Sequence, residues 1–199
     1  AAWMLLYNRL NKFGGKVIAG DYQAWDKRLC GQAIWEAVEL VNAWYDKDDS
    51  IDEETKKMNR QVRLLLAVIL IHSNVIVQRV LFRTVQGLPS GVPVTSVLNS
   101  VANWLYIDSA IFTILEEKGA LLDMLPCELN DYMELALYGD DHIIALHHKL
   151  RDFITFRDIQ KHFRERRVGY TDTQKNEQFS FEFEDITKTT FVKLTFCVD

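Results

Sequence analysis

The stretch Tyr138-Gly139-Asp140-Asp141 lies between two short and mostly apolar runs, residues 134–137 and residues 142–146. Runs of this length are typical of buried strands, and a Gly-Asp pair between them supplies the positive φ that a tight hairpin turn needs. The pattern therefore predicts a β-hairpin with two adjacent carboxylates at its tip. Because like charges this close repel each other, such a turn either stays solvated or meets a cation.

The composition is that of a single globular domain. The 199 residues are 48% hydrophobic and 26% charged, with a net charge of -5 that argues against a free-standing nucleic-acid binder. The longest uncharged apolar run, residues 64–71, is too short to cross a bilayer. Three widely spaced cysteines, Cys30, Cys127 and Cys197, favour reduced thiols in a cytosol-like compartment. The chain starts without Met and ends in a strand-like segment, so we expect a fragment of a larger protein.

A second pair of acids lies near the start of the chain. Residues 16–20 form a short apolar run that ends at Asp21, and a helical pattern begins after Asp26 and continues to Trp44. We expect Asp21 near the end of a buried strand and Asp26 in the turn that leads into the helix. Taken alone, Asp26 is better explained as an acid that the helix dipole favours.

A helix and a pair of strands are predicted next. Ser50 and Glu53 have the spacing of a capping box, which predicts a helix over about residues 52–72. Its end, residues 64–71, is apolar on nearly all sides and should be buried. The β-branched and aromatic residues of 74–86 predict one or two strands.

The segment from 87 to 93 is a loop rich in Gly and Pro, and residues 94–117 have the pattern of a mainly apolar helix. Three polar residues, Thr95, Asn99 and Asn103, recur every fourth position, so they lie on one face of that helix. Polar side chains on a buried helix need partners. Interhelical hydrogen bonding and ligand binding explain this stripe equally well.

The last third of the chain predicts one helix and a closing strand. Thr155 and Asp158 can cap an amphipathic helix that ends near Arg167, with Gly169 as its C-terminal stop. Residues 189–196 have the pattern of a further strand.

The two acidic strand ends can meet if their strands are neighbours in one sheet. Asp21 and Asp140 could then bridge a pair of magnesium ions, because hard divalent cations take carboxylate oxygens. Two such ions suit in-line nucleotidyl transfer. Three histidines lie in or just after the second hairpin strand, and their spacing gives no convincing metal set. We expect these residues at the surface or at strand ends: His142, His147 and His148.

In order and spacing, these motifs resemble those of viral RNA-dependent RNA polymerases, most closely the palm region of the picornavirus-like positive-strand group. The resemblance spans the chain from about Val17 onward. Asp21 and Asp26 resemble motif A; Ser90, Gly91, Thr95 and Asn99 resemble motif B; Tyr138-Gly139-Asp140-Asp141 resembles motif C; and the segment around Phe191 and Lys193 resembles motif E, with Leu194 where the family more often has Arg.

The resemblance implies a role for each matching residue. Asp21, Asp140 and Asp141 would bind Mg²⁺, or Mn²⁺ in its place, and Lys175 would protonate the leaving pyrophosphate. Nucleotide binding would fall to Asp26, Ser90, Gly91, Thr95 and Asn99, with Asp26, Thr95 and Asn99 recognising the ribose 2′-hydroxyl. Lys193 would contact RNA.

The resemblance also implies an α+β fold: a polymerase palm with a small antiparallel, ferredoxin-like sheet backed by helices. Residues 1–199 would form one palm fragment with a fingers-type insertion at about residues 46–86, lacking most of the fingers and the thumb. Its partners would be an RNA template and primer or nascent strand, nucleoside triphosphates, the remaining fingers and thumb, and other viral replication proteins. The implied location is a replication complex in the host cytoplasm, and the fragment alone is expected to be inactive.

Two alternatives stay open from the sequence. A reverse transcriptase shares the palm and a pair of aspartates at the hairpin, but the polar pair Asp26 and Asn99 disfavours it, because a DNA-making enzyme has reason to block the 2′-hydroxyl. The chain could instead be a non-catalytic structural or binding fragment with solvated acidic turns. If Asp21 and Asp140 lie too far apart in the folded chain to share metals, the polymerase interpretation fails.

Overall fold

The computed structural model describes residues 2–89, 91, 93–120, 129–173, 175 and 182–196. The chain divides into two compact units, of which the first comprises Ala1–Gln23 with Tyr106–Asp199 and the second Ala24–Leu105. Among the described helices, none combines the length and the apolar character needed to cross a membrane.

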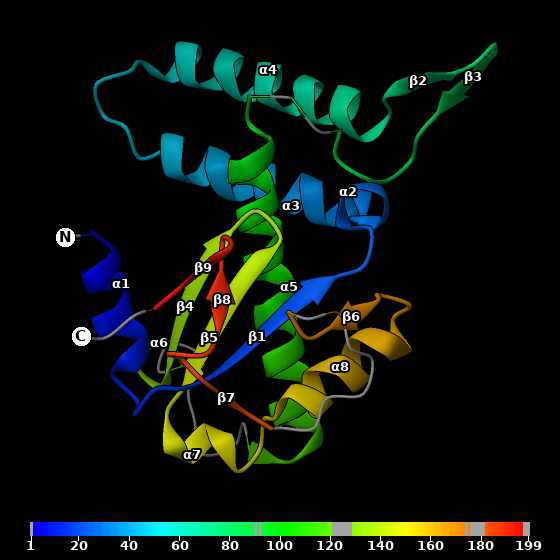
Figure 1. Cartoon of the computed structure of the whole chain (residues 1–199). Coiled ribbons are helices and arrows are strands. Elements are labelled where there is room, and N and C mark those ends of the chain that lie inside the picture. Colours follow the sequence, from blue (N-terminus) through cyan, green and yellow to red (C-terminus); the bar gives the residue numbers. More distant parts are fainter. Residues whose placement is uncertain are drawn as a thin grey trace. The chain divides into compact units, whose positions relative to one another are not determined.

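An antiparallel sheet forms the centre of the first unit (Figure 1). The predicted hairpin is confirmed, because Tyr138 pairs with Asp141 and leaves Gly139-Asp140 as a two-residue turn in which Gly139 has a φ of 64°. The predicted first strand is confirmed as well and extends through Asp21. The strand order is β4 (Met133–Tyr138), β5 (Asp141–Leu146), β1 (Lys16–Tyr22) and β6 (Tyr170–Thr171), and β7 (Glu184–Asp185) pairs with the start of β1.

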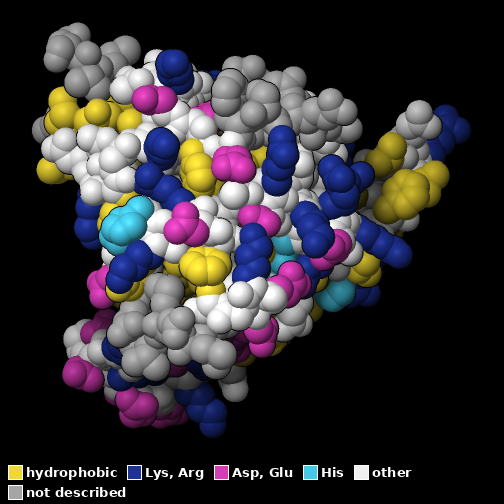
Figure 2. Space-filling view, turned by 90° about the horizontal axis from the view of Figure 1, so that it is seen from below, with side chains coloured by type: hydrophobic (Ala, Val, Ile, Leu, Met, Phe, Trp, Pro, Cys, Tyr) yellow, Lys and Arg dark blue, Asp and Glu magenta, His cyan; other side chains and the backbone are white. Residues whose placement is uncertain are grey.

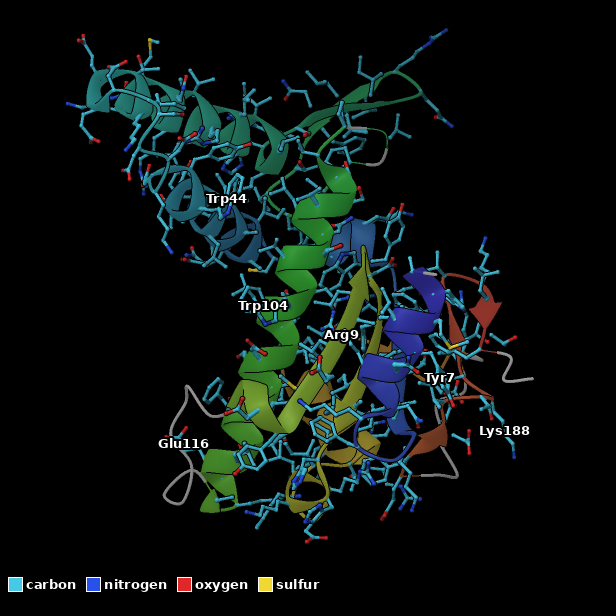
Figure 3. All side chains as sticks on the ribbon, turned by 90° about the vertical axis from the view of Figure 1, so that its left-hand side faces the viewer. Tyr7, Arg9, Trp44, Trp104, Glu116 and Lys188 are labelled. Atoms are coloured by element: carbon cyan, nitrogen blue, oxygen red, sulfur yellow. The ribbon has the colours of Figure 1, made fainter. Side chains whose placement is uncertain are left out.

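One face of this sheet packs against the two ends of the chain. Cross-strand partners point to the same side of a sheet, so Val17 and Ala145 share a face that is buried in the core. Helix α1 (Ala2–Asn11), which the sequence did not predict, covers that face together with Phe191 and Phe196. Figure 3 shows Tyr7 on the side of α1 that faces the C-terminal strands, where its ring lies 5.9 Å from that of Phe196.

The part of α5 (Thr95–Glu117) that belongs to the first unit, from Tyr106 on, and α8 (Phe156–Glu165) cover the opposite face of the sheet (Figure 1). The ring of Tyr22, on β1, meets Tyr106 of α5 at 6.2 Å and Phe163 of α8 at 5.5 Å. These contacts sandwich the sheet between two apolar layers. Short helices α6 (Leu129–Tyr132) and α7 (His148–Arg151) lie at the ends of the hairpin strands.

The second unit contains α2 (Trp25–Arg28), α3 (Gly31–Tyr45), α4 (Glu53–Ile71), the hairpin β2 (Asn74–Val77) with β3 (Val80–Arg83), and the start of α5. Helices α3 and α4 lie side by side (Figure 1). Arg60 of α4 binds both Glu39 and Asp46, and Arg63 donates to Asn42 over 2.5 Å. The predicted pair of strands after α4 is confirmed.

The prediction of one continuous helix after Asp26 is wrong. Leu29 and Cys30 have extended backbone angles and separate α2 from α3. The carbonyl of buried Leu29 accepts a hydrogen bond from the backbone N–H of Gly87 over 2.7 Å. This tertiary contact takes the place of a helical hydrogen bond, so Asp26 lies within a one-turn helix and not in a turn before a long one.

Two predictions about α4 are also wrong. The N-cap is Asp52, which accepts from the backbone N–H of Thr55 over 2.9 Å, whereas Ser50 donates to the carboxylate of Asp48. The apolar end of α4 is not buried all round: Leu65 and Ile69 are each 63% exposed. In this unit α4 packs against α3 on one side, and a single neighbouring helix can cover only one face.

The closing segment is a hairpin and not the single strand predicted over residues 189–196. Strands β8 (Thr190–Phe191) and β9 (Leu194–Thr195) pair across Val192-Lys193, and both turn residues have positive φ, 52° and 61°. The predicted helix is confirmed as α8, but the residue with positive φ at its C-terminal end is Arg167 and not Gly169.

The capping box of α8 gives a stability prediction. Asp158 accepts hydrogen bonds from the backbone and side chain of Thr155 and pairs with Lys118 at 2.8 Å. Burial raises the pKa of Asp158, but these bonds outweigh it and hold the pKa below its usual value. We expect Asp158→Ala to lower the free energy of unfolding by about 1–2 kcal/mol, measured by urea unfolding.

The carboxylate of Asp158 should also make the free energy of unfolding depend on pH. Because the folded-state pKa of Asp158 is lowered, its contribution is present above the usual pKa of about 3.8 and disappears as the pH falls below that value. The matched control is Glu165→Ala in the same helix, whose exposed pair with Lys161 spans 3.8 Å and should matter by less than about 0.5 kcal/mol. Equal effects of the two variants at pH 7 would contradict the prediction.

Candidate active site

Asp21 and Asp141 lie at the same end of two neighbouring strands. The ladder pairs Val17 with Ala145 and ends at Gly20 with His142, so Asp21 and Asp141 follow directly after its last pair. By alternation both aspartates belong to the face that carries Val17 and Ala145. Asp140 occupies the turn that precedes Asp141. The two acidic strand ends are therefore adjacent, as the sequence argument required.

The three carboxylates affect one another electrostatically. Burial raises the pKa of Asp21, the ammonium of Lys175 opposes this, and the charge of Asp140 raises it again, so the net pKa is above its usual value. Burial likewise raises the pKa of Asp141, and the charges of Asp140 and Asp21 raise it further. This end of the sheet is therefore a partly buried concentration of negative charge.

Two lysines and one backbone amide oppose that charge. The Nζ of Lys175 lies 3.8 Å from Oδ2 of Asp21, and the lysine side chain is 79% exposed. The backbone N–H of Val192 donates to the carboxylate of Asp141, and Lys193 lowers the pKa of the same group. The turn of the β8–β9 hairpin thus reaches the end of the sheet at which the aspartates lie.

The carboxylates do not surround a common point. In the segments that the structure describes, no three His, Cys, Asp or Glu side chains are arranged so that they could hold one metal ion. Mutual repulsion favours such separation while Lys175 supplies the nearest positive charge to Asp21. Away from the site, basic and acidic side chains are interspersed on the face that Figure 2 presents.

The opposite face of the same strands carries a buried polar pair. His142 lies at a strand end, in the last pair of the β1–β5 ladder, which is one of the two places expected for it, but at 2% exposure it is not at the surface. Its Nε2 lies 2.6 Å from Oη of Tyr170, and its Nδ1 lies 3.2 Å from the carbonyl oxygen of Asp140. Burial lowers the pKa of His142 to about 4, against the opposing hydrogen bond to Asp140, so the ring is neutral at pH 7.

The motif B residues are placed in the second unit with Asp26. Trp25, the neighbour of Asp26, donates its indole N–H to Oδ1 of Asn99 over 3.1 Å. The backbone N–H of Leu88 donates to the carbonyl of Asp26 over 2.9 Å. The structure therefore joins α2, the loop before α5 and the first turns of α5.

The loop itself is held by Thr95, whose hydroxyl donates to the carbonyl of Pro89 over 3.0 Å. Gly91 is exposed with a φ of 88°, while Ser90 lies outside the described residues. Gly87 has a φ of 84°, and a Cβ there would come within 2.6 Å of the Asp26 carbonyl oxygen. A glycine at this position lets the loop approach the backbone of Asp26 closely.

Sequence reasoning did not find the partners of three predicted residues: Trp25 for Asn99, His142 for the carbonyl of Asp140 and Val192 for Asp141. It also missed Tyr170, which bonds His142. For Trp25 and Tyr170, no local sequence pattern indicates that the polar atom of the ring has a specific partner. A signal did exist for His142, because a histidine inside an apolar strand that points into a core needs a partner. Val192 acts through its backbone, which sequence patterns do not reveal.

Comparison with known proteins places the chain in a family. Residues 1–198 match the model of the family described as viral RNA-dependent RNA polymerase. The genome polyprotein of Rice tungro spherical virus (strain Vt6) is 30% identical over 201 residues, covering 98% of this chain and 5% of the polyprotein. The genome polyprotein of Deformed wing virus is 27% identical over 194 residues, covering 96% of this chain and 6% of that polyprotein.

A solved structure has the same fold. The Sicinivirus 3Dpol RNA-dependent RNA polymerase superposes with a TM-score of 0.72 at 21% identity, covering 99% of this chain and 37% of that one. The α+β fold with a small antiparallel sheet backed by helices is thus the fold of a polymerase, as the sequence predicted. On the family match over nearly its whole length, this chain belongs to the viral RNA-dependent RNA polymerases.

Proposed function

We propose that this chain is the catalytic palm of an RNA virus replicase, with part of the fingers contributed by residues 46–86. The reaction is template-directed attack of an RNA 3′-hydroxyl on the α-phosphate of a nucleoside triphosphate, with release of pyrophosphate. The proposal is supported by one observation above all. Asp21 and Asp141 end neighbouring strands on one face of the sheet, beside Asp140 in the turn.

The chemistry of the donor set suits a pair of Mg²⁺ ions, or Mn²⁺ in their place, although in the described residues no three such side chains surround one point. Carboxylate oxygens are the ligands that these hard cations prefer. Burial, with a smaller contribution from the neighbouring carboxylates, raises the pKa values of Asp21 and Asp141, and a bound divalent cation would stabilise their charged forms. Asp21 and Asp140 would be the principal ligands, with Asp141 in support. Bound there, the ions would stabilise the charge of the attacking and leaving oxygens.

The two lysines are proposed to act on the substrates. Lys175 is exposed and next to Asp21, so its ammonium can reach the phosphate end of a nucleotide and give a proton to the departing pyrophosphate. Lys193 lies in the turn that contacts Asp141 and is exposed, which suits a contact with the phosphate backbone of RNA.

Ribose recognition is proposed for Asp26, Thr95 and Asn99, with Ser90 and Gly91 in the adjoining loop. Because Oδ1 of Asn99 accepts from Trp25, the amide is fixed with its Nδ2 group as the donor. A donor of this kind can bond the 2′-hydroxyl, which is the group that separates RNA precursors from DNA precursors. Selection for this group favours an RNA polymerase over a reverse transcriptase.

The proposed function also implies binding partners and a location for the chain. Its partners are an RNA template with a primer or nascent strand, nucleoside triphosphates, the remaining fingers and thumb, and other viral replication proteins. The replication complex would lie in the host cytoplasm. The chain spans 37% of the solved polymerase that it resembles, and we expect the rest of the polymerase to be needed for activity.

Replacing a principal ligand tests the reaction. In the complete polymerase, Asp140→Asn should reduce primer extension by roughly three orders of magnitude, because several kcal/mol of transition-state stabilisation depends on metal binding. The midpoint of thermal unfolding should stay near that of the wild type. The matched control is Asp131→Asn, an exposed acid at the base of the hairpin. Extension by Asp140→Asn at the rate of this control would exclude Asp140 as a ligand.

Removing a positive charge near Asp21 and removing a negative charge near it should shift the pKa of Asp21 in opposite directions. Lys175→Met removes the ammonium that lowers the pKa of Asp21 and should raise that pKa further, whereas Asp140→Asn should lower it. Titration of carboxyl ¹³C shifts in the metal-free protein measures both effects. Lys188→Met, at an exposed lysine next to Asp185, serves as the control and should leave Asp21 unchanged.

Ribose selectivity should depend on the amide of Asn99 and on the indole that holds it. Asn99→Ala should lower the preference for ribonucleotides over deoxyribonucleotides by about tenfold, the effect of losing one hydrogen bond to substrate. Trp25→Phe should have a smaller effect in the same direction because it frees the amide to rotate. Ser96→Ala, on the exposed side of the same helix, should leave the ratio of kcat/KM values unchanged. A normal ratio in Asn99→Ala would contradict the assignment.

A further inference from the structure

We propose that His142 and Tyr170 are positioning residues for the metal-binding aspartates. Their buried hydrogen bond would fix the distance between the strand ends that carry Asp21 and Asp140. The inference rests on the proposed function, because it assigns a role in the same reaction. Neither side chain points to the acidic face: both belong to the layer behind it.

The hydrogen bonds define the state of the imidazole. The carbonyl oxygen of Asp140 can only accept, so Nδ1 of His142 carries a proton and donates to it over 3.2 Å. Nε2 of the neutral ring is then an acceptor, and the hydroxyl of Tyr170 donates to it over 2.6 Å. Two hydrogen bonds therefore run in series, from the Tyr170 hydroxyl to the imidazole and from the imidazole to the carbonyl of Asp140 in the acidic turn.

This series of hydrogen bonds crosses β1 at Gly20, a residue without a side chain. Gly20 pairs with His142, and a Cβ on Gly20 would lie 2.1 Å from the hydroxyl oxygen of Tyr170. The tyrosine ring thus lies directly over the glycine, stacked on the imidazole at 5.5 Å with an interplanar angle of 10°. Phe156 and Phe163 contact the ring at 5.4 and 5.1 Å, which leaves it little freedom to move.

The two bonded residues come from the strands on either side of β1. His142 is on β5, next to Asp141, and Tyr170 is on β6, next to Thr171, which pairs with Asp21. A link between β5 and β6 across β1 therefore holds the strand of Asp21 between two fixed neighbours. Strand β6 is only two residues long and has few ladder hydrogen bonds of its own, so a side-chain link contributes much to its placement.

Metal-assisted transfer depends on such placement. Carboxylates that share cations must be held to within about half an ångström of their working positions, and a shift of about 1 Å can cost two orders of magnitude in rate. The three aspartates repel one another, so the sheet needs a restraint that does not come from them. The hydrogen bond behind them supplies it.

The test removes one hydroxyl in the complete polymerase. Tyr170→Phe keeps the stacked ring but deletes the donor to Nε2 of His142. We expect the Mg²⁺ concentration for half-maximal primer extension to rise about tenfold and kcat to fall about tenfold, while the KM for nucleotide stays within about twofold. Thr189→Val is the matched control: it deletes another fully buried hydroxyl, bonded to Glu184 and to the carbonyl of Asp185, and should leave the Mg²⁺ dependence unchanged.

A wild-type Mg²⁺ dependence in an active Tyr170→Phe enzyme would overturn the proposal. If that variant does not fold, the ¹⁵N shifts of His142 in the wild-type enzyme decide instead: a protonated Nδ1 with a bare, hydrogen-bonded Nε2 is expected, and the opposite tautomer would overturn the proposal. A wild-type polymerase that makes no RNA contradicts the proposed function, and the His142 spectrum still decides the hydrogen-bond chain.

Discussion

The antiparallel ladder between β1 and β5 is the interaction on which the rest of the first unit depends. It joins residues far apart in the sequence, from Val17 with Ala145 to Gly20 with His142. Because side chains alternate along a strand, a slip of one residue would move Asp21 to the face that packs against α8 and leave an unpaired charge in the apolar layer. Burial of both faces therefore specifies the register, and the register places the acids together.

The fold could be predicted where the signals are local. The tight turn at Gly139 and the capping box of Thr155 with Asp158 each depend on residues within a few positions of one another, and both are present. Predictions failed where a distant contact decides. The break after α2 depends on a hydrogen bond between Leu29 and Gly87, and the turn at Val192-Lys193 has positive φ values that neither residue normally favours.

In the candidate site, too, the features that depend on local sequence could be predicted and those that depend on distant contacts could not. The position of the aspartates at neighbouring strand ends could be predicted from sequence because short apolar runs that end in acids are recognisable, and the need of Asn99 for a partner could be predicted because it is a polar residue on an apolar helix. Which partner it has could not be found, since the indole of Trp25 comes from another element. The approach of Lys175 and the Val192 amide to the aspartates is likewise a property of the folded chain.

The missing side chain of Gly20 has a consequence for sequence variation. The ring of Tyr170 occupies the space that a Cβ at position 20 would need, so the two positions cannot both carry large groups. Among related polymerases, a residue larger than glycine at position 20 should occur together with a small side chain at position 170. Such a pair would also have to change at position 142, because an imidazole without the tyrosine hydroxyl would be buried with Nε2 unsatisfied. The three positions should therefore vary as a set.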